Sequence, residues 1–416
     1  MDVFLMTLQI TRNAISVAVS LYLFYQLFIA LFGLKRPQKA EIIPNRQHRF
    51  AIIIAARNEQ DVIAYLIESL KQQNYPSELF DIIVVADNCT DYTAEVARSC
   101  GALTFERFNN REVGKGFALH WIFDILLKEY PEKYDAMCVF DADNLADAEF
   151  LGEMNRQLCA GHQIVQGYRC AKNPRDSLVS GYYAIYWSTL CRFYYLPRTR
   201  LGLSAFVGGT GFCFCIDIIK ETGWQTKTMS EDSEFSLQNI IAGRRVIYAH
   251  EAVFYDDQPT EFSQSLTQRR RWVNGTFQCI RYEGRKMAHG LSTKGYRLRL
   301  FDAMMCLATL PMLGLATVGL IAHIIVTTLN SEQILNGFGL LLLSAMLALF
   351  LVHQIPALFL FDKKTKRPTG MAILTFPIFL LSYGVVVLSA LIFPRTTWKP
   401  IRHNRGVTME ELNKEG

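Results

Sequence analysis

The chain has 416 residues, half of them hydrophobic, and a formal net charge of +5. With a mean hydropathy of +0.14, it is too apolar for an ordinary soluble enzyme of this length. The mild positive charge suits an anionic membrane surface or an anionic ligand, and it gives no signal for nucleic acid binding. The ten cysteines form no CxxC pair and no zinc-ligand spacing with histidine, so we expect reduced thiols.

The first apolar stretch, residues 13–34, contains 22 residues without a charge and is long enough to span a bilayer. Its apolar core is longer than that of a cleaved signal peptide. Lys35, Arg36 and Lys39 follow the stretch, whereas only Arg12 precedes it. By the positive-inside rule, residues 1–40 are a membrane helix with a basic cytosolic flank.

From residue 50, short apolar runs alternate with helical patterns. The runs at 50–56, 82–87 and 136–143 are predicted strands, and the apolar periodicity that begins at Ile63 marks a helix between the first two. A βαβα series predicts an α/β domain with a mostly parallel sheet, here residues 41–260. Such sheets bind ligands at the carboxyl ends of their strands.

Acidic residues follow these strands, and we expect them to meet in one crevice. They are Glu59, Asp87, Asp141 and Asp143. Asp141 and Asp143 point the same way on a strand, so their charges repel each other unless a proton or a cation bridges them. A divalent cation with oxygen ligands, Mg²⁺ or Mn²⁺, is the natural bridge.

The segment REVGKGFAL, residues 111–119, supplies a positive charge. It is not a Walker loop, because Gly116 follows Lys115 where serine or threonine is required. Between two glycines, Lys115 can still approach a diphosphate closely. An exposed loop lysine is the alternative.

The segment TMSEDSEF, residues 228–235, places Glu231 and Asp232 at a predicted helix start. Thr228 and Glu231 have the spacing of a capping box. The acids could simply complement the helix dipole, or they could present a general base at the helix tip. Both interpretations are compatible.

Two further segments contain candidate binding residues. In QRRRW, Gln268, Arg271 and Trp272 share a helical face, where a cation could meet a diphosphate and an indole could stack on a sugar. Lipid headgroups are the alternative partners of these arginines, because residues 261–295 read as amphipathic interface helices. In FVGGTGF, the three glycines around Phe206, Gly209 and Thr210 suit a tight acceptor pocket or an ordinary turn.

In this order and spacing, the five motifs resemble those of the processive membrane glycosyltransferases of family 2, which include cellulose, chitin and hyaluronan synthases. The motifs are Asp87, Lys115 in GKG, Asp141-Ala-Asp143, Ser230-Glu231-Asp232 and Gln268-Arg-Arg-Arg271-Trp272. The resemblance covers about residues 50–280 and the flanking apolar helices. Two departures are Ser230, where threonine is usual, and fewer membrane segments than in cellulose synthases.

The resemblance implies a GT-A fold, a nucleotide-diphosphate sugar and a divalent cation. It implies that Glu59 and Asp87 contact the nucleoside. Lys115 and Asp141 then meet the diphosphate, and Asp143 binds the metal. Asp232 is the implied general base, the Gln268–Trp272 motif holds the acceptor end, and Phe206, Gly209 and Thr210 lie in the acceptor pocket.

Residues 296–394 form a C-terminal transmembrane region, with apolar stretches at about 300–329, 338–361 and 370–393. The tail, residues 395–416, faintly resembles the gating loop of these synthases, with Trp398 and Arg402 as contacting residues. Basic residues on both sides of the last stretch favour a cytosolic tail. One of the three stretches, the first with Pro311 or the last with Pro377, is therefore expected to be interfacial or re-entrant.

We expect an integral protein of the cell membrane with a cytosolic catalytic domain. Its partners are a UDP-sugar, most simply UDP-glucose, a growing β-glucan and the lipid bilayer, and we expect no nucleic acid. The alternative is a non-processive enzyme that adds one sugar to a lipid. A catalytically inactive nucleotide sensor is a third possibility, which the complete set of acids disfavours.

Overall fold

A computed structural model of the protein describes residues 2–35, 44–330, 366–393 and 406–414. The predicted stretch at 338–361 and the tail residues Trp398 and Arg402 lie outside this range. The described strands are β1 (Phe50–Ala56), β2 (Phe80–Asp87), β3 (Leu103–Arg107), β4 (Ala136–Asp141), β5 (Leu145–Ala146), β6 (Ile164–Ala171), β7 (Phe212–Cys215) and β8 (Val246–Asp256). They form one sheet in the order β3-β2-β1-β4-β7-β6-β8-β5.

The sheet is mostly parallel, as predicted, with an antiparallel strand at its centre. β1 to β4 pair in parallel, and so do β6 and β8. β7 runs antiparallel between β4 and β6, and β5 pairs antiparallel with β8 at the edge. β7 suits a central position because Phe212 and Phe214 enter one core while Cys213 enters the other.

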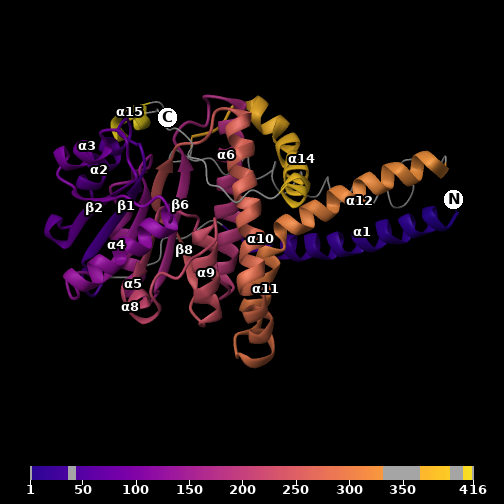
Figure 1. Ribbon diagram of the computed structural model, residues 1–416, viewed down its shortest axis with the longest axis horizontal. Helices are drawn as coiled ribbons and strands as arrows, with labels where there is room; N and C mark the ends of the chain where they lie inside the picture. The colour runs from indigo at the N-terminus through magenta and orange to yellow at the C-terminus, as the bar shows by residue number, and fades with distance from the viewer. Residues whose placement is uncertain (1, 36–43, 331–365, 394–405, 415–416) are drawn as a thin grey trace.

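Helices cover both faces of the sheet (Figure 1). On one face, α4 (Lys115–Glu129) and α9 (Glu231–Ile241) pack with Ile53 in one hydrophobic core. On the other face, α2 (Ile63–Lys71) and α5 (Phe150–Cys159) pack with Ile52 and Ile54. Successive residues of β1 therefore enter opposite cores, which explains its unbroken apolar run.

Shorter helices complete the domain. They are η1 (Ser77–Leu79), α3 (Thr93–Ser99), α6 (Leu178–Thr189), the π-helix η2 (Leu190–Tyr195), α7 (Leu196–Arg200) and α8 (Asp217–Thr222). The predicted amphipathic segment 261–295 is one helix, α10 (Phe262–Thr293). α11 (Arg297–Leu307) follows it and ends just before Pro311, which lies in the first turn of the next helix, where proline is tolerated.

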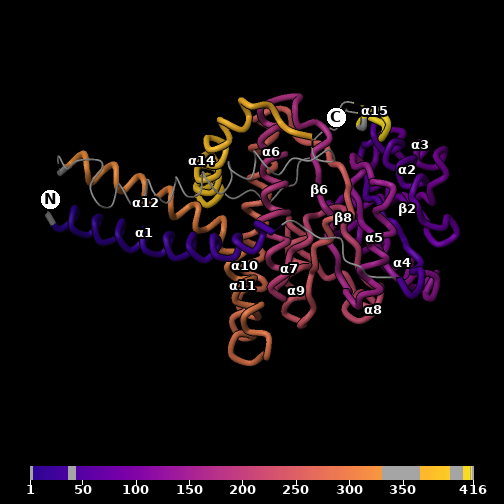
Figure 2. Tube along the Cα trace, turned by 180° about the vertical axis from the view of Figure 1, so that it is seen from behind, coloured from indigo at the N-terminus to yellow at the C-terminus, as the bar shows by residue number. Residues whose placement is uncertain are grey.

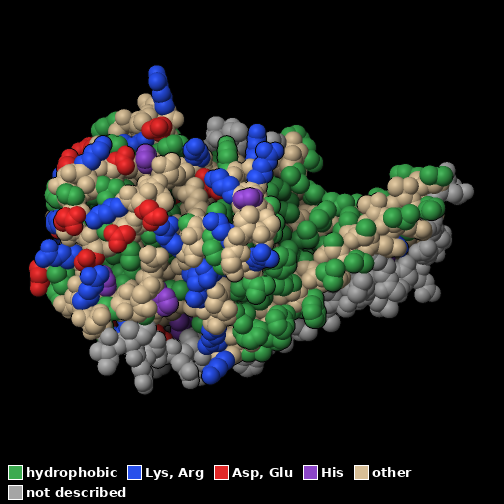
Figure 3. Space-filling view, turned by 90° about the horizontal axis from the view of Figure 1, so that it is seen from below, with side chains coloured by type: hydrophobic (Ala, Val, Ile, Leu, Met, Phe, Trp, Pro, Cys, Tyr) green, Lys and Arg blue, Asp and Glu red, His purple; other side chains and the backbone are tan. Residues whose placement is uncertain are grey.

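Among the described residues, three helices are long and apolar enough to cross a membrane: α1 (Asp2–Leu31), α12 (Thr309–Asn330) and α14 (Gly370–Ile392). α1 begins well before the predicted start at residue 13, because the preceding residues are also mostly apolar. α1 and α12 run side by side away from the sheet (Figures 1 and 2). Hydrophobic side chains cover this arm and the adjoining part of the domain, whereas charged side chains concentrate on the domain's far end (Figure 3).

A buried polar cluster fastens α1 to the domain. The Arg198 guanidinium on α7 donates to both carboxylate oxygens of Asp302 on α11, and its Nη2 donates to Gln26 on α1 at 3.0 Å. The Tyr25 hydroxyl donates to Asp302 at 2.8 Å. Because Arg198 and Asp302 are almost fully buried, removing one partner would leave an uncompensated charge. This cluster fixes where the membrane helix meets the domain.

The end of the chain returns to the domain. α15 (Met409–Lys414) lies near α2 and α3 (Figure 1). Val407 and Leu412 are buried in the core that also contains α4 and α9. A Cβ atom added to Gly406 would lie only 2.3 Å from the Tyr65 ring, so the backbone touches α2 there. The described part of the tail, residues 406–414, is therefore packed on the domain.

Candidate active site

The strand-end acids converge as predicted. Asp87 and Asp141 are the last residues of β2 and β4, and Glu59 and Asp143 follow β1 and β4. All four line one cavity of about 1510 Å³. They meet because β1, β2 and β4 are parallel neighbours whose carboxyl ends share one edge of the sheet.

Lys115 is the first residue of α4 and reaches across the cavity. Its Nζ donates to Asp141 Oδ1 at 2.5 Å and to the Gly209 carbonyl oxygen at 2.7 Å. Burial alone would raise the pKa of Asp141, but Lys115, with Arg169 and Arg271, lowers it below its usual value. Asp141 is therefore an ionised carboxylate paired with an ammonium group, and the contact between Lys115 and a diphosphate stays a prediction.

Asp87 and Glu59 are the other two strand-end acids that line the cavity. Arg107 donates to Asp87 Oδ1 at 2.7 Å, and both side chains are nearly buried. Burial raises the pKa of Asp87, and the Arg107 guanidinium limits that rise. The Glu59 backbone N–H donates to Thr93 Oγ1 at 2.8 Å, which fixes the turn after β1.

Glu231 and Asp232 begin α9 and line the cavity. The predicted capping box between Thr228 and Glu231 is wrong. Glu234, one turn further on, accepts the backbone N–H groups of Lys227 and Thr228, both at 2.7 Å. Because Glu234 takes that role, Glu231 is left facing the cavity.

The two acids at the tip of α9 have elevated proton affinities. Burial and the neighbouring Asp232 carboxylate raise the pKa of Glu231 to about 7. Burial also raises the pKa of Asp232, although the Ser233 backbone N–H, at 2.7 Å from Oδ1, favours its ionised form. A carboxyl group whose pKa is raised is a stronger base than an exposed one, which is what general base catalysis at neutral pH requires.

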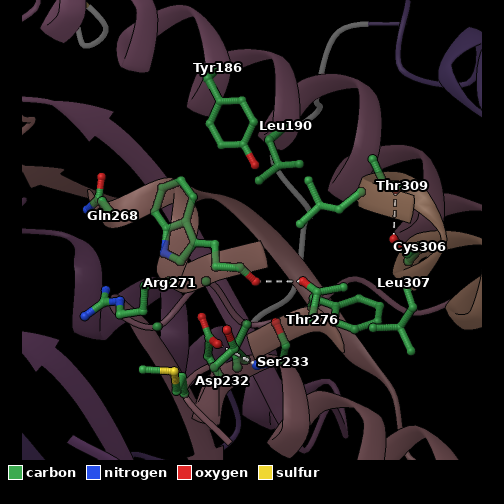
Figure 4. Close-up of a pocket in the computed structure, with 18 of the residues that line it drawn as sticks. Tyr186, Leu190, Asp232, Ser233, Gln268, Arg271, Thr276, Cys306, Leu307 and Thr309 are labelled. Atoms are coloured by element: carbon green, nitrogen blue, oxygen red, sulfur yellow. Dashed lines mark hydrogen bonds between the residues drawn. The ribbon is translucent and has the colours of Figure 1, made fainter. Parts of the chain in front are cut away.

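α10 carries Gln268, Arg271 and Trp272 to the cavity wall. In Figure 4, Asp232 and Tyr186 lie on opposite sides of the cavity, with Gln268 and Arg271 on one flank. Trp272 lies nearly parallel to Tyr186, with ring centroids 6.3 Å apart, and edge-on to Trp187 at 5.7 Å. These rings form an aromatic wall above the acid pair.

The other two arginines of QRRRW bind protein rather than the cavity. Arg269 is fully buried and donates to Ser382 Oγ on α14 at 2.7 Å. Arg270 donates to the Phe393 carbonyl oxygen at 2.6 Å. These bonds fasten α14 across α10, so the alternative in which the arginines bind lipid headgroups is not needed for either residue.

The FVGGTGF segment contacts both the strand-end acid Asp141 and the acid Asp232 at the tip of α9. Phe206 and Gly209 line the cavity, and the Thr210 hydroxyl accepts the Asp141 backbone N–H at 2.9 Å. Gly209 has a φ of +83°, and a Cβ atom there would lie 3.2 Å from Asp232 Oδ2. Glycine is therefore required by both the backbone conformation and the closeness of Asp232.

Sequence reasoning missed Arg169 on β6, Asp256 at the end of β8, and the aromatic residues Tyr186 and Trp187 on α6. All four line the cavity. Asp256 obeys the same rule as Asp141, an acid that ends an apolar strand, and could have been found that way. Arg169 was detectable as a charge inside an otherwise buried strand. Trp398 and Arg402 lie outside the described residues, so their placement stays a prediction.

A mixed sheet with carboxylates at its parallel strand ends, a lysine at a helix start and an acid pair at a second helix tip defines the GT-A class of transferase. The chain belongs to glycosyltransferase family 2, because residues 48–275 match the family model described as glycosyltransferase like family 2.

The individual relatives share only about a quarter of their residues with this chain over the matched part. A probable glycosyltransferase, YdaM, of Bacillus subtilis is 26% identical over 242 residues, 55% of each chain. Glucomannan 4-beta-mannosyltransferase 7 of Arabidopsis thaliana is 24% identical over 248 residues, 54% of this chain and 42% of that one. The chain thus matches about half the length of these curated relatives.

A solved structure confirms the GT-A fold. The mannosyltransferase PcManGT of Pyrobaculum calidifontis, in complex with GDP-Man and Mn²⁺, superposes with a TM-score of 0.60. The match covers 92% of this chain and 99% of that one, at 16% sequence identity.

Proposed function

We propose that the protein is an inverting, processive glycosyltransferase that polymerises a β-linked polysaccharide from a UDP-sugar and moves it into or across a membrane. The observation that carries the proposal is the continuity of the cavity. Its polar end is lined by Lys115, Asp141 and Asp232, and its other end lies between α1 and α12. The site for the sugar donor, the proposed general base and a path toward the bilayer therefore belong to one cavity.

The residues support a single displacement. Asp232 accepts the proton of the acceptor hydroxyl, whose oxygen attacks the anomeric carbon of the donor sugar. The bond to the diphosphate breaks on the opposite face, so an α-linked donor gives a β linkage. Lys115 and Arg271 supply positive charge to the departing diphosphate. Trp272 offers an aromatic face to the acceptor sugar, and Glu59 and Asp87 contact the nucleoside.

The carboxylate oxygens available as metal ligands fit Mg²⁺ or Mn²⁺. Asp141 and Asp143 are hard oxygen donors on the cavity wall, and the described ranges contain no group of three or more candidate protein ligands. One or two carboxylates leave coordination positions for phosphate oxygens and water, as is usual for Mg²⁺. When bound, the cation neutralises charge that develops on the diphosphate. The Mn²⁺ in the Pyrobaculum neighbour supports this assignment.

UDP-glucose is the proposed donor, and a cellulose-like or mixed-linkage β-glucan is the proposed product. The named activity of the Arabidopsis relative, a glucomannan 4-beta-mannosyltransferase, supports a β-linked polysaccharide. The GDP-Man in the Pyrobaculum neighbour makes GDP-mannose the competing donor. The competition is settled by supplying each donor separately.

A lipid acceptor is the second candidate, favoured by the far end of the cavity. Its lining there is mostly apolar, with Leu23 and Leu27 from α1 and Leu313, Ala316 and Leu320 from α12, although Ser20, Gln26 and Thr317 also line it. An alkyl chain fits such a surface, whereas a polysaccharide is bound mainly by aromatic and polar groups. The product would then be a glycolipid carrying a single sugar.

The test is to incubate membranes that contain the protein with radiolabelled UDP-glucose or GDP-mannose, with Mn²⁺ or EDTA. The proposal expects label in material that organic solvent cannot extract and that a β-glucanase degrades. Label that is entirely solvent-extractable would establish the glycolipid synthase instead. Full activity in EDTA would overturn the cation assignment, and Asp143→Ala is the matching variant, expected to be inactive with Mn²⁺ present.

A further inference from the structure

A buried ion pair between Arg169 and Asp256 joins β6 to β8 beside the strand-end acid Asp143. Nε of Arg169 donates to Asp256 Oδ2 at 2.8 Å, and Nη2 donates to the same oxygen at 2.5 Å. The two side chains are 8% and 2% exposed, respectively. Gln258 Nε2 also donates to this oxygen at 2.5 Å. The pair is thus fully hydrogen-bonded, which is the condition under which buried charges are tolerated.

On one side, the pair is linked to the residues proposed to hold the cation. Asn144 Nδ2 donates to Asp256 Oδ1 at 2.7 Å and to Asp143 Oδ1 at 3.2 Å, so one amide bridges the two carboxylates. The Thr210 hydroxyl donates to Asn144 Oδ1, which sets the orientation of that amide. Asp256 is therefore a second buried acid beside Asp143, and Arg169 neutralises it.

On the other side, the pair is linked to the glycine segment that lies beside Asp232. Nη1 of Arg169 donates to the Gly208 carbonyl oxygen at 3.0 Å, and the guanidinium lies 3.9 Å from the Trp187 ring centroid. Gly208 precedes Gly209, whose carbonyl oxygen accepts Lys115 and whose Cα faces Asp232. Arg169 therefore helps to hold this glycine segment, together with Gln166, whose Oε1 accepts the Gly208 backbone N–H at 2.7 Å.

Charge connects the two sides. Burial disfavours the guanidinium charge, but Asp256, and then Asp141 and Asp143, raise the pKa of Arg169 above its usual value. Both proposed cation ligands thus lie within electrostatic range of Arg169. A change of one charge at this pair alters the potential at the cation site through a buried, weakly screened medium.

We propose that Arg169 and Asp256 are a positioning pair, which sets the net charge around Asp143 and holds the Phe206–Thr210 segment in place beside Asp232. The pair contributes one positive and one negative charge, so in the intact site its own net charge beside Asp143 is zero. The inference rests on the proposed cation-dependent function.

The test measures Mn²⁺ binding directly, by electron paramagnetic resonance titration of the purified full chain with UDP present and without acceptor. Arg169→Gln leaves Asp256 unneutralised beside the cation, so Mn²⁺ should bind about fivefold or more tightly. Asp256→Asn leaves the Arg169 charge unopposed, so Mn²⁺ should bind about fivefold or more weakly. Turnover should fall in both variants.

The opposite signs distinguish this proposal from a structural role, which would weaken Mn²⁺ binding in both variants or in neither. Arg156→Gln is the matched control. It breaks another largely buried ion pair, with Glu153 on α5, whose residues do not line the cavity. The control should leave Mn²⁺ affinity unchanged.

Arg169→Lys keeps the charge but cannot make all the bonds of the guanidinium. It should retain wild-type Mn²⁺ affinity and lose turnover. If Arg169→Gln does not fold, the Asp256→Asn and Arg169→Lys variants still test the proposal. Unchanged or tighter Mn²⁺ binding in Asp256→Asn, or wild-type turnover in Arg169→Lys, overturns the proposal. A wild-type protein that fails to bind Mn²⁺ with UDP would instead overturn the cation dependence in the proposed function.

Discussion

Three carboxyl groups around one cavity differ in proton affinity because their neighbours differ. Asp141 contacts the Lys115 ammonium, and its pKa is lowered despite burial. Glu231 and Asp232 adjoin each other at the tip of α9, and burial raises the pKa of both. Such a divergence separates a group that stays charged beside a diphosphate from one that can accept a proton.

Asp232→Asn should reduce sugar transfer about 10²–10⁴-fold, because the amide cannot accept the proton of the acceptor hydroxyl. UDP affinity should stay within about twofold of wild type, since the shape of the side chain is kept. Initial rates of transfer and calorimetric titration with UDP measure the two effects. Asp217→Asn, an exposed acid in the first turn of α8, is the control and should be fully active. Equal losses of UDP affinity and turnover would assign Asp232 to the donor instead.

Glu231→Gln should stabilise the protein above neutral pH and leave its stability unchanged near pH 4. The pKa of Glu231 is raised from 4.5 to about 7 in the folded protein. As the pH rises from 4.5 to 7, the unfolded chain loses this proton first, so wild-type stability falls over that interval. The glutamine variant has no such loss, and its unfolding midpoint at pH 8 should be higher by about 2–4 °C. A midpoint difference that is equal at pH 4 and pH 8 would contradict the raised pKa.

Among the elements, those set by local pattern were predictable and those set by long-range packing were not. The run at 50–56 became β1 with the predicted bounds, whereas the strand predicted at 136–143 ends at Asp141 and leaves Asp143 in the turn that follows. The antiparallel insertion of β7 depends on which strands it meets, which its four residues do not encode. The capping box failed because Glu234, not Glu231, reaches the backbone of Thr228. Arg169 was missed because its partner Asp256 is distant in sequence.

α10 is the element that aligns the site, because it also touches the start of α9. A Cβ atom added to Gly275 would lie 2.0 Å from Ser230 Oγ, so the two helices meet at van der Waals contact. Gly275→Ala should therefore push Trp272 away from Asp232 and lower turnover about tenfold or more, although alanine is the better helix former.

Gly284→Ala on the same helix is the matched control for this substitution. Its nearest neighbour would be the Ile280 side chain at 3.9 Å, an ordinary contact. It should keep full turnover and stabilise the protein by about 0.5–1 kcal/mol. Rates and unfolding midpoints of both variants are compared. Full turnover in Gly275→Ala would mean that α10 does not set the position of the site.

At the scale of the whole molecule, α12 packs against both of the other long apolar helices, α1 and α14. α1 and α12 extend together from the domain, and Gly319 lets them approach closely, since a Cβ atom there would lie 3.0 Å from the Ile15 side chain. α14 packs on the other side of α12, where a Cβ atom added to Gly384 would lie 1.8 Å from Thr317 Oγ1. It also packs on α6 and α10, and the bonds from Arg269 and Arg270 hold it there. All three described helices are long and apolar enough to cross a bilayer, so the expected interfacial stretch, at 300–329 or 370–393, stays a prediction.

The packing of α15 on the domain makes a prediction about the two ends of the chain. α15 packs on the catalytic domain through Val407 and Leu412, so the tail must lie on the same side of the membrane as the domain. The basic residues after α1 predict that this side is the cytosol, and a spanning α1 then predicts an N-terminus on the outside. Cysteine substituted at Glu410, an exposed position on α15, should resist a membrane-impermeant maleimide in intact cells and react after permeabilisation. Val3→Cys, at the 80% exposed start of α1, is the control and should react in intact cells. Labelling of both positions in intact cells would separate the tail from a cytosolic domain, and labelling of Glu410→Cys alone would invert the whole arrangement.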